Sequence, residues 1–183
     1  MSLFTILLLL SSALLCSGAK IYDSIQLAID DIENLAEQGD ADAQNNLGLM
    51  YANGTGVAED DVEAVKWYRK AAEQGLAAAQ NNLGYMYRAG EGVVEDATEG
   101  VKWYRKAAEQ GHAMAQTVLG LAYGTGGGVP EDYVVAYMWL NIAAAQGIEP
   151  AKKAKDLIAA RMTIEQIAEA QKLSREWLAK RSR

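Results

Sequence analysis

Adjacent carboxylates are the residues of this sequence whose chemistry suggests catalysis most directly. They recur as Glu59 with Asp60 and as Glu95 with Asp96, and a glycoside hydrolase uses a carboxyl pair as its acid and its base or nucleophile. Both pairs stand at the same point of a repeated pattern, just before an apolar helical stripe. Acidic side chains at that point accept hydrogen bonds from the free amides of a helix start. We therefore expect these pairs to cap helices.

Other catalytic groups are scarce. His112 is the single histidine and follows the glycine that ends a helix, so we interpret it as a connector or cap residue. The single cysteine, Cys16, lies in an N-terminal segment that we expect to be cleaved off. Three serines follow residue 19, and none of them stands in a nucleophile-elbow pattern: Ser24, Ser174 and Ser182. The sequence therefore predicts a protein that is not an enzyme, with no catalytic residue, no cofactor and no metal site.

An internal repeat organises the chain. The residues that mark its register are Gly39, Gly75, Gly111 and Gly147, together with Trp67, Trp103 and Trp139, each spaced by 36 residues. A repeat of this length indicates a solenoid. Residues 39–74 and 75–110 are identical at 26 positions and differ at 10. This agreement exceeds what two helix pairs need in order to pack, so we interpret the copies as a duplication.

Each copy is predicted to be a helical hairpin. Apolar residues with helical spacing precede Gly54, which ends the first helix because glycine adopts left-handed backbone angles without a clash. Asp60 with Glu63 has the spacing of a capping box and marks the start of the second helix. The predicted buried stripe of that helix is Ala64, Trp67, Tyr68, Ala71 and Ala72. Gly48 and its equivalents are expected to let the two helices approach closely.

These residues form the pattern A-x-x-x-L-G-x-x-Y-x-x-G-x-G-V, followed by D, W-Y, A-A and G, which closely resembles the Sel-1-like repeat family. The resemblance implies an all-α fold, a right-handed α-solenoid of antiparallel helix-turn-helix repeats, and a role as a protein-binding scaffold. It covers three repeats, which we place at residues 39–74, 75–110 and 111–147. The third copy departs at Met138, Leu140 and Gly127, and we interpret it as adapted to the cap that follows.

Both ends of the array are predicted to carry caps. Residues 20–38 align with the second helix of a repeat and form an N-terminal half-repeat. Its predicted inner residues are Ala28, Ile32 and Leu35, and its polar outer residues are Asp23, Asp30, Asp31 and Glu33. Residues 148–183 form C-terminal capping helices, one starting at Pro150 and one capped by Thr163 with Gln166. The apolar residues of the last helix are Ile164, Ile167, Ala170, Leu173, Trp177 and Leu178.

The first nineteen residues have the outline of a signal peptide. An apolar run from Leu3 to Cys16 is followed by the small residues Ser17-Gly18-Ala19, which suit signal peptidase. The run of about 14 residues is short for a membrane span, which needs about 20. We expect cleavage before Lys20 and a secreted or periplasmic protein.

A lipoprotein is the alternative for the same segment. Lipid modification of Cys16 calls for a small residue directly before it, whereas Leu15 stands there. We therefore expect contact with a membrane only if the signal segment is retained or Cys16 is lipidated.

Charge separates along the chain. Residues 20–147 hold eight basic and nineteen acidic side chains, a net charge of −11, while residues 148–183 hold nine basic and five acidic, a net charge of +4. An acidic body disfavours nucleic acid as a partner. We interpret the basic tail as a solvated helix face.

The binding site is predicted from the positions at which the first two copies differ. Four of them lie on the first helix away from its packing stripe: Asp42 with Ala78, Leu49 with Tyr85, Ala52 with Arg88, and Asn53 with Ala89. In tetratricopeptide-like solenoids that helix lines the concave face, so the resemblance places a groove for a peptide or a partner helix there. The predicted groove residues are Asn45, Asn46, Leu49, Asn53, Asn81, Asn82, Tyr85, Arg88 and Leu121. The asparagines would bond the ligand backbone, and Tyr85 and Arg88 would be its anchors.

Two other functions stay open. One is a cell-envelope enzyme, or a module that binds peptidoglycan or β-lactams, as in the cysteine-rich branch of the family. The lack of cysteine after residue 19 argues against that branch. The other is an anchored subunit of a membrane complex.

Overall fold

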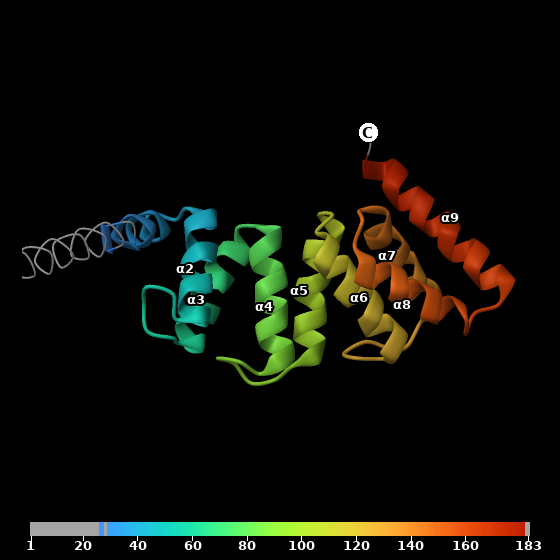
Figure 1. The fold of residues 1–183 in the computed structure, drawn as a ribbon, viewed down its shortest axis with the longest axis horizontal. Coiled ribbons are helices and arrows are strands. Elements are labelled where there is room, and N and C mark those ends of the chain that lie inside the picture. The colour runs from blue at the N-terminus through green and yellow to red at the C-terminus, as the bar shows by residue number, and fades with distance from the viewer. Residues whose placement is uncertain (1–25, 28, 182–183) are drawn as a thin grey trace, which may run out of the picture.

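The structure is a computed structural model that describes residues 26–27 and 29–181 (Figure 1). Within these ranges the chain forms helices and turns and no strand. A helical segment over residues 29–37 comes first. The helices that follow it are α2 (Ala41–Asn53), α3 (Asp61–Glu73), α4 (Ala77–Ala89), α5 (Ala97–Glu109), α6 (Ala113–Thr125), α7 (Tyr133–Ala145), α8 (Glu149–Ala159) and α9 (Ile164–Arg181). The predicted fold class, an all-α solenoid of helical hairpins, is confirmed.

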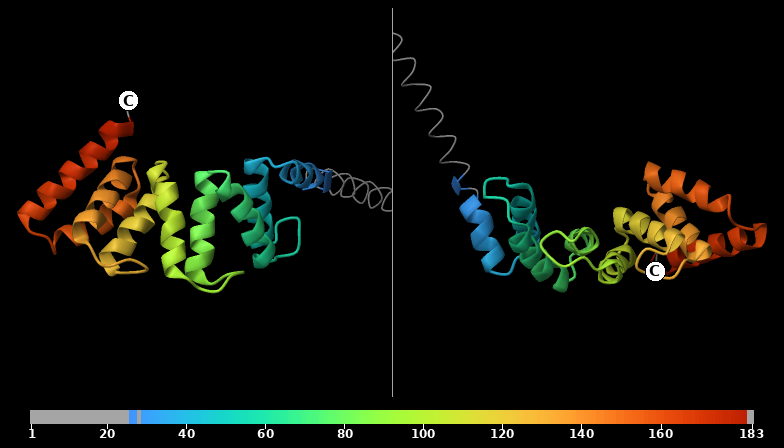
Figure 2. Two further views of the ribbon diagram at one scale, coloured as in Figure 1. Left: turned by 180° about the vertical axis from the view of Figure 1, so that it is seen from behind. Right: turned by 90° about the horizontal axis from the view of Figure 1, so that it is seen from below.

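The helices pair in the order of the chain. α2 packs against α3, α4 against α5, and α6 against α7, and successive pairs are joined by contacts of α3 with α4 and of α5 with α6. The pairs follow one another along a curved array, which is clearest in the view from below (Figure 2). Tyr68, Tyr104 and Leu140 are equivalent residues of the three repeats, and all three are buried. The apolar core therefore runs from repeat to repeat.

Two glycines show why the repeat needs this residue type. At Gly92, where φ is +66°, a Cβ atom would lie 2.1 Å from the carbonyl oxygen of Asp61, so the loop after α4 rests on the first turn of α3. At Gly48, inside α2, a Cβ atom would lie 2.7 Å from the ring of Tyr68 on α3. The predicted close approach of the paired helices is confirmed.

Of the two hydrogen bonds that the predicted capping box would form at the start of α3, only the one accepted by the Asp60 side chain is present. Asp60 accepts hydrogen bonds from the backbone N–H groups of Val62 and Glu63, each at 3.0 Å. The reciprocal bond of a capping box is absent, because the backbone N–H of Asp60 donates to the carbonyl of Tyr51 at 2.9 Å. Glu63 pairs with Lys66 instead. The prediction of a full box was wrong because the loop returns the chain onto α2, where that amide already finds an acceptor.

The second and third repeats behave alike. The backbone N–H groups of Asp96 and Asp132 donate to the carbonyls of Tyr87 and Tyr123, at 2.8 and 2.9 Å. Asp132 caps α7 by accepting from the N–H of Val135 at 3.0 Å, without any acidic residue at the box position. A single aspartate is therefore sufficient at each of these helix starts.

Glutamines link neighbouring repeats inside the array. Gln80 is buried, and its side-chain amide donates to the carbonyl of Ala72 at 3.1 Å while its oxygen accepts from Gln110 at 2.7 Å. The same two bonds recur around Gln44 and around Gln116. Because these buried amides are hydrogen-bonded, the cost of removing them from water is offset, and the bonds help to fix the spacing of the repeats.

The N-terminal cap differs in part from its prediction. Ile32 is half-buried, and the buried residues of the segment are Ile29 and Ala36. Leu35, predicted to face inward like Ala71, is 49% exposed, because no helix covers this side of the segment among the described residues. Ala28 and Asp23 lie outside the described residues.

The C-terminal cap is formed by α8 and α9. Thr163 and Gln166 form a reciprocal capping box at the start of α9, with N–H to side-chain distances of 2.9 and 3.3 Å. Ala170 is buried and Ile167, Leu173 and Trp177 are partly buried. Ile164, another of the apolar residues of this helix, is 82% exposed, because α9 begins beyond the end of α7 and turns its middle and C-terminal half onto that helix (Figure 1). Leu178 is also exposed, at 43%.

The third repeat is adapted to this cap, as expected. In the first two repeats Lys70 and Lys106 place their ammonium groups 3.7 and 3.8 Å from the ring centres of Trp67 and Trp103. Ile142 takes the place of these lysines in the third repeat and is fully buried. Trp177 of α9 then packs on the tryptophan of α7 instead. An apolar residue is required there because α9 excludes water from this face.

Candidate partner-binding groove

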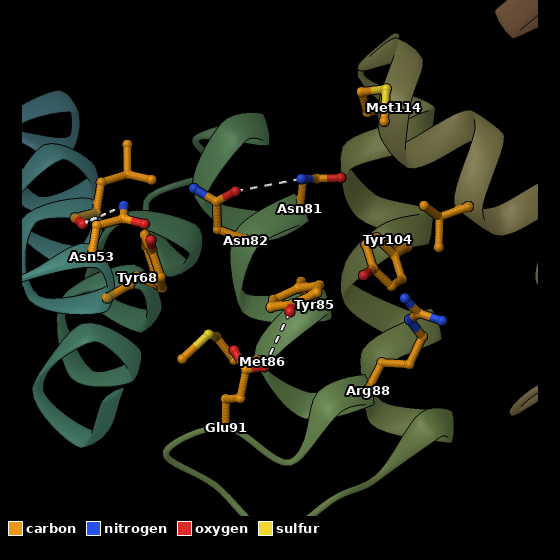
Figure 3. Close-up of a pocket in the computed structure, with 13 residues that line it drawn as sticks. Asn53, Tyr68, Asn81, Asn82, Tyr85, Met86, Arg88, Glu91, Tyr104 and Met114 are labelled. Carbon is orange, nitrogen blue, oxygen red and sulfur yellow. Dashed lines mark hydrogen bonds between the residues drawn. The ribbon is translucent and has the colours of Figure 1, made fainter. Parts of the chain in front are cut away.

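A hollow of about 450 Å³ lies between the first helices of the three repeats (Figure 3). Its walls come from α2, α4 and α6, and the tyrosines Tyr68 of α3 and Tyr104 of α5 lie at its base. The residues that line it are Leu49, Ala52, Asn53, Tyr68, Asn81, Asn82, Tyr85, Met86, Arg88, Glu91, Tyr104, Met114 and Val118. We call this hollow, together with the smaller one beside Leu121, the groove.

The predicted site residues fall into three groups. Those that line the larger hollow are Leu49, Asn53, Asn81, Asn82, Tyr85 and Arg88. Leu121 lines the smaller hollow of about 140 Å³, which Arg88 also borders. Asn45 is buried beneath the surface, and Asn46 is exposed but lines neither hollow. The structure therefore brings seven of the nine residues to the groove.

The asparagines are less available than the sequence suggested. The side-chain amide of Asn82 donates to the side-chain oxygen of Asn45 at 3.0 Å, which ties α4 to α2. Asn81 donates to Asn82 at 3.4 Å, and Asn53 donates to the carbonyl of Leu49 at 2.8 Å. Part of their hydrogen-bonding capacity is therefore used within the protein.

Apolar side chains at equivalent positions form a stripe along the groove. Leu49, Tyr85 and Leu121 are spaced by one repeat each, and their exposed fractions are 39%, 44% and 43%. Met114, at the first turn of α6, is also exposed. Single apolar side chains exposed here and there are normal on a protein surface. Exposed apolar side chains that line up on one face are instead a feature of interaction surfaces.

Two polar pairs shape the chemistry of the larger hollow. The hydroxyl of Tyr85 donates to the carboxylate of Glu91 at 3.1 Å, and this bond with the carboxylate charge raises the pKa of Tyr85. Burial raises the pKa of Tyr104, and the neighbouring guanidinium of Arg88 opposes that shift by hydrogen bonding and by its charge. Both tyrosines are therefore neutral hydroxyl groups at neutral pH.

Sequence reasoning missed several lining residues. Tyr68 was placed in the core, which is correct for its ring, but Tyr68 and its buried equivalent Tyr104 also border the hollow. Burial, with a contribution from Asp61, raises the pKa of Tyr68 to about 12. Met114 and Val118 were missed because only the first two copies were compared. A comparison that included the third copy would have found Val118, which replaces Asn46 and Asn82.

The residues that were considered as candidates for catalysis form hydrogen bonds that cap helices. Asp60 and Asp96 accept backbone hydrogen bonds at helix starts. His112 caps α6 by accepting from the backbone N–H of Ala115 at 3.3 Å, and burial lowers its pKa. Within the described residues, no group of three or more histidine, cysteine, aspartate or glutamate side chains is arranged to hold a metal ion.

Comparison with known proteins identifies the family. The family model described as Sel1 repeat matches residues 41–76, 77–112 and 113–148, which is more than half of the chain. The chain therefore belongs to the Sel1 repeat family. Sel1 repeats generally mediate protein–protein interactions and are generally not catalytic. The class of protein is thus a Sel1 repeat protein, with a fold that is typical of protein–protein interaction scaffolds.

Solved structures give the same picture. The crystal structure of a protective antigen of uropathogenic Escherichia coli strains, displaying an SLR fold, aligns with a TM-score of 0.78 and 40% identity over 84% of this chain and 33% of that one. This chain therefore spans about a third of that relative. A Sel1 repeat protein from Oxalobacter formigenes aligns with a TM-score of 0.65 and 46% identity, over 70% of this chain and 97% of that one.

A third similarity concerns the fold alone. Helicobacter pylori cysteine rich protein B aligns with a TM-score of 0.58 and 20% identity, over 73% of this chain and 96% of that one. A search of curated proteins found no match.

Proposed function

We propose that this protein is a non-enzymatic interaction scaffold that binds a peptide or a partner helix in the groove. The observation that carries the proposal is the exposed stripe of Leu49, Tyr85 and Leu121. These residues stand at one position of the repeat, where the middle copy has tyrosine in place of leucine, whereas buried positions such as Leu47 and Leu83 keep the same residue. A stripe of this kind offers apolar contact area, and the hydroxyl and guanidinium groups beside it can orient a ligand through hydrogen bonds.

The groove suits an elongated ligand better than a compact small molecule. It runs across α2, α4 and α6 and continues into the smaller hollow beside Leu121. An extended segment or one face of a helix presents side chains at intervals along such a surface. Tyr85 stands in the middle of the stripe, where contacts are best shielded from water, and is expected to be the main anchor.

The experiment is a selection of displayed random peptides on the purified protein, followed by cross-linking. The photoreactive residue p-benzoylphenylalanine replaces Tyr85 or, as a control, Lys102, an exposed side chain of α5 that does not line the groove. The selected peptide should cross-link at position 85 and not at position 102. Equal cross-linking at both positions, or at 102 alone, would place the interaction elsewhere.

The enzymatic alternative has a direct test. Hydrolysis of nitrocefin and of peptidoglycan fragments by the purified protein is expected to stay at the background rate. Turnover that survives further purification and disappears with Tyr85→Ala and Arg88→Ala would contradict a purely scaffolding function.

The proposed location is the periplasm or the exterior of the cell, after cleavage before Lys20. The segment 1–19 lies outside the described residues, and no helix of the described part is long and apolar enough to cross a membrane. N-terminal sequencing of the exported form should begin at Lys20. An intact Met1 form in the membrane would indicate a signal anchor, and a lipidated Cys16 a lipoprotein.

A further inference from the structure

Arg88 lies where the two hollows of the groove meet. Its side chain borders both the hollow of about 450 Å³ and the smaller one of about 140 Å³. The smaller hollow is otherwise lined by Val118, Leu121, Ala122, Thr125 and Gly127, all from α6 and the loop after it. A chain that occupies both hollows must therefore pass the guanidinium group of Arg88.

The charge of Arg88 is not compensated by a carboxylate of the described part of the protein. The ion pairs there join Lys66 with Glu63, Lys102 with Glu99, and Lys172 with Glu176. Glu91, the acidic residue that lines the larger hollow, accepts instead from the hydroxyl of Tyr85. The neighbour of the guanidinium is the neutral hydroxyl of Tyr104. A guanidinium without a carboxylate partner presents N–H donors in a rigid planar arrangement, which matches the two oxygens of a carboxylate.

The rest of the protein limits how acidic the ligand is. Residues 20–147 carry a net charge of −11, so a run of acidic residues would be repelled along most of the groove face. A single carboxylate at Arg88 avoids this repulsion. The smaller hollow is mostly aliphatic, and an apolar space of about 150 Å³ holds a benzene-sized group. One aliphatic side chain of the ligand therefore fits it.

We infer that the groove selects a peptide segment with one internal aspartate or glutamate, which pairs with Arg88, and an aliphatic side chain beside it, which enters the hollow at Leu121. The carboxylate belongs to an internal residue because the groove continues on both sides of Arg88, so the ligand chain does not end there. This inference rests on the proposed peptide-binding function.

The test uses two random-peptide libraries on the full-length protein, one with fixed flanking residues at both ends and one with free C-termini. The wild-type protein should select internal aspartate or glutamate next to leucine, isoleucine or valine from the first library. Arg88→Glu should replace this preference by lysine or arginine at the same position. Arg175→Glu, the same charge change on an exposed residue of α9, should select the same peptides as the wild type.

Dissociation constants then measure how much the pairing of the peptide carboxylate with Arg88 contributes to binding. A change of the selected glutamate to glutamine should weaken binding to the wild type about tenfold, and it should have little effect on Arg88→Ala, because the charged partner is already gone. The glutamine peptide tests the pair on the wild-type protein even if a variant folds poorly.

Three results would overturn the inference. Peptides that bind but show no acidic preference, or an unchanged preference with Arg88→Glu, would rule out the pairing while leaving a peptide-binding groove. Acidic selection only at free C-termini would rule out the internal residue. Failure of the wild type to select any peptide would contradict the proposed function and the inference with it.

Discussion

The ring of Trp177 on α9 stands edge-on to the ring of Trp139 on α7, with centroids 5.6 Å apart and planes at 72°. The guanidinium of Arg181 lies 4.9 Å from the centre of the Trp177 ring and donates to the carbonyl of Gln110 at 2.6 Å. One helix thus fastens both the last repeat and the end of α5 in the repeat before it.

Replacement of Trp177 should loosen this end of the array. Trp177→Ala removes an aromatic pair and opens a cavity above Ile142, so we expect a loss of about 2 to 3 kcal/mol in the free energy of unfolding. Urea titration checks this, and Trp177→Phe, which keeps an aromatic ring, should show only part of this loss.

A chain ended after Arg161 should expose the same apolar face and aggregate. A truncated protein that stays monomeric with an unchanged melting temperature would rule out this role for α9.

The loop after α4 gives a sharper test of how repeats join. Gly92→Ala combines a left-handed backbone with a Cβ atom 2.1 Å from the carbonyl oxygen of Asp61, and should destabilise the fold by about 3 kcal/mol or more. Gly127→Ala is the matched control, because the nearest atom to its Cβ is the Thr125 hydroxyl oxygen at 3.4 Å. Similar melting temperatures for the two variants would show that the loop is not docked on α3.

The cap of α6 should make stability depend on pH. Burial lowers the pKa of His112 below its usual 6.5, so the folded state favours the neutral ring that accepts the hydrogen bond from Ala115. The unfolded chain then binds more protons between the two pKa values. The contribution of the cap is complete above about pH 6.5 and is lost as the pH falls through the lowered folded pKa.

His112→Asn is the comparison for this cap, because asparagine is a good N-cap that does not titrate. Relative to this variant, the wild type should lose stability as the pH falls from 7.5 to 4.5, because its folded state must then bind a proton at the buried ring. Parallel stability curves for the two proteins over that range would show that the cap does not titrate.

Local features of the fold could be predicted from the sequence because each depends on a few neighbouring residues. Gly54 ends α2 and Asp60 begins α3 because backbone angles and amide acceptors are settled within one turn. The second half of the capping box failed because the amide of Asp60 bonds to Tyr51, nine residues back. The predicted burial of Leu35 was wrong because burial at the ends depends on where neighbouring helices stop.

The location of the groove could be predicted from the sequence, but the hydrogen bonds of the side chains that line it could not. Variation between copies pointed to Tyr85 and Arg88, both of which line it. The bond between Asn82 and Asn45 depends on the spacing of α2 and α4, which residue types alone do not give. The tyrosine hydroxyls at the base of the larger hollow were missed for the same reason, since a buried ring can still direct its hydroxyl group to a surface.

The affinity of a selected peptide for Tyr85→Ala with Arg88→Ala, measured by isothermal titration calorimetry, tests the scaffold account most directly. Both side chains are exposed, so the melting temperature should stay within about 2 °C of the wild type, while binding weakens by about 2 kcal/mol or more. A double variant with Lys66→Ala and Lys102→Ala, on exposed positions away from the groove, should bind as the wild type does. Unaltered affinity of the groove variant would contradict the account and move the site to the outer face or the basic C-terminal helices.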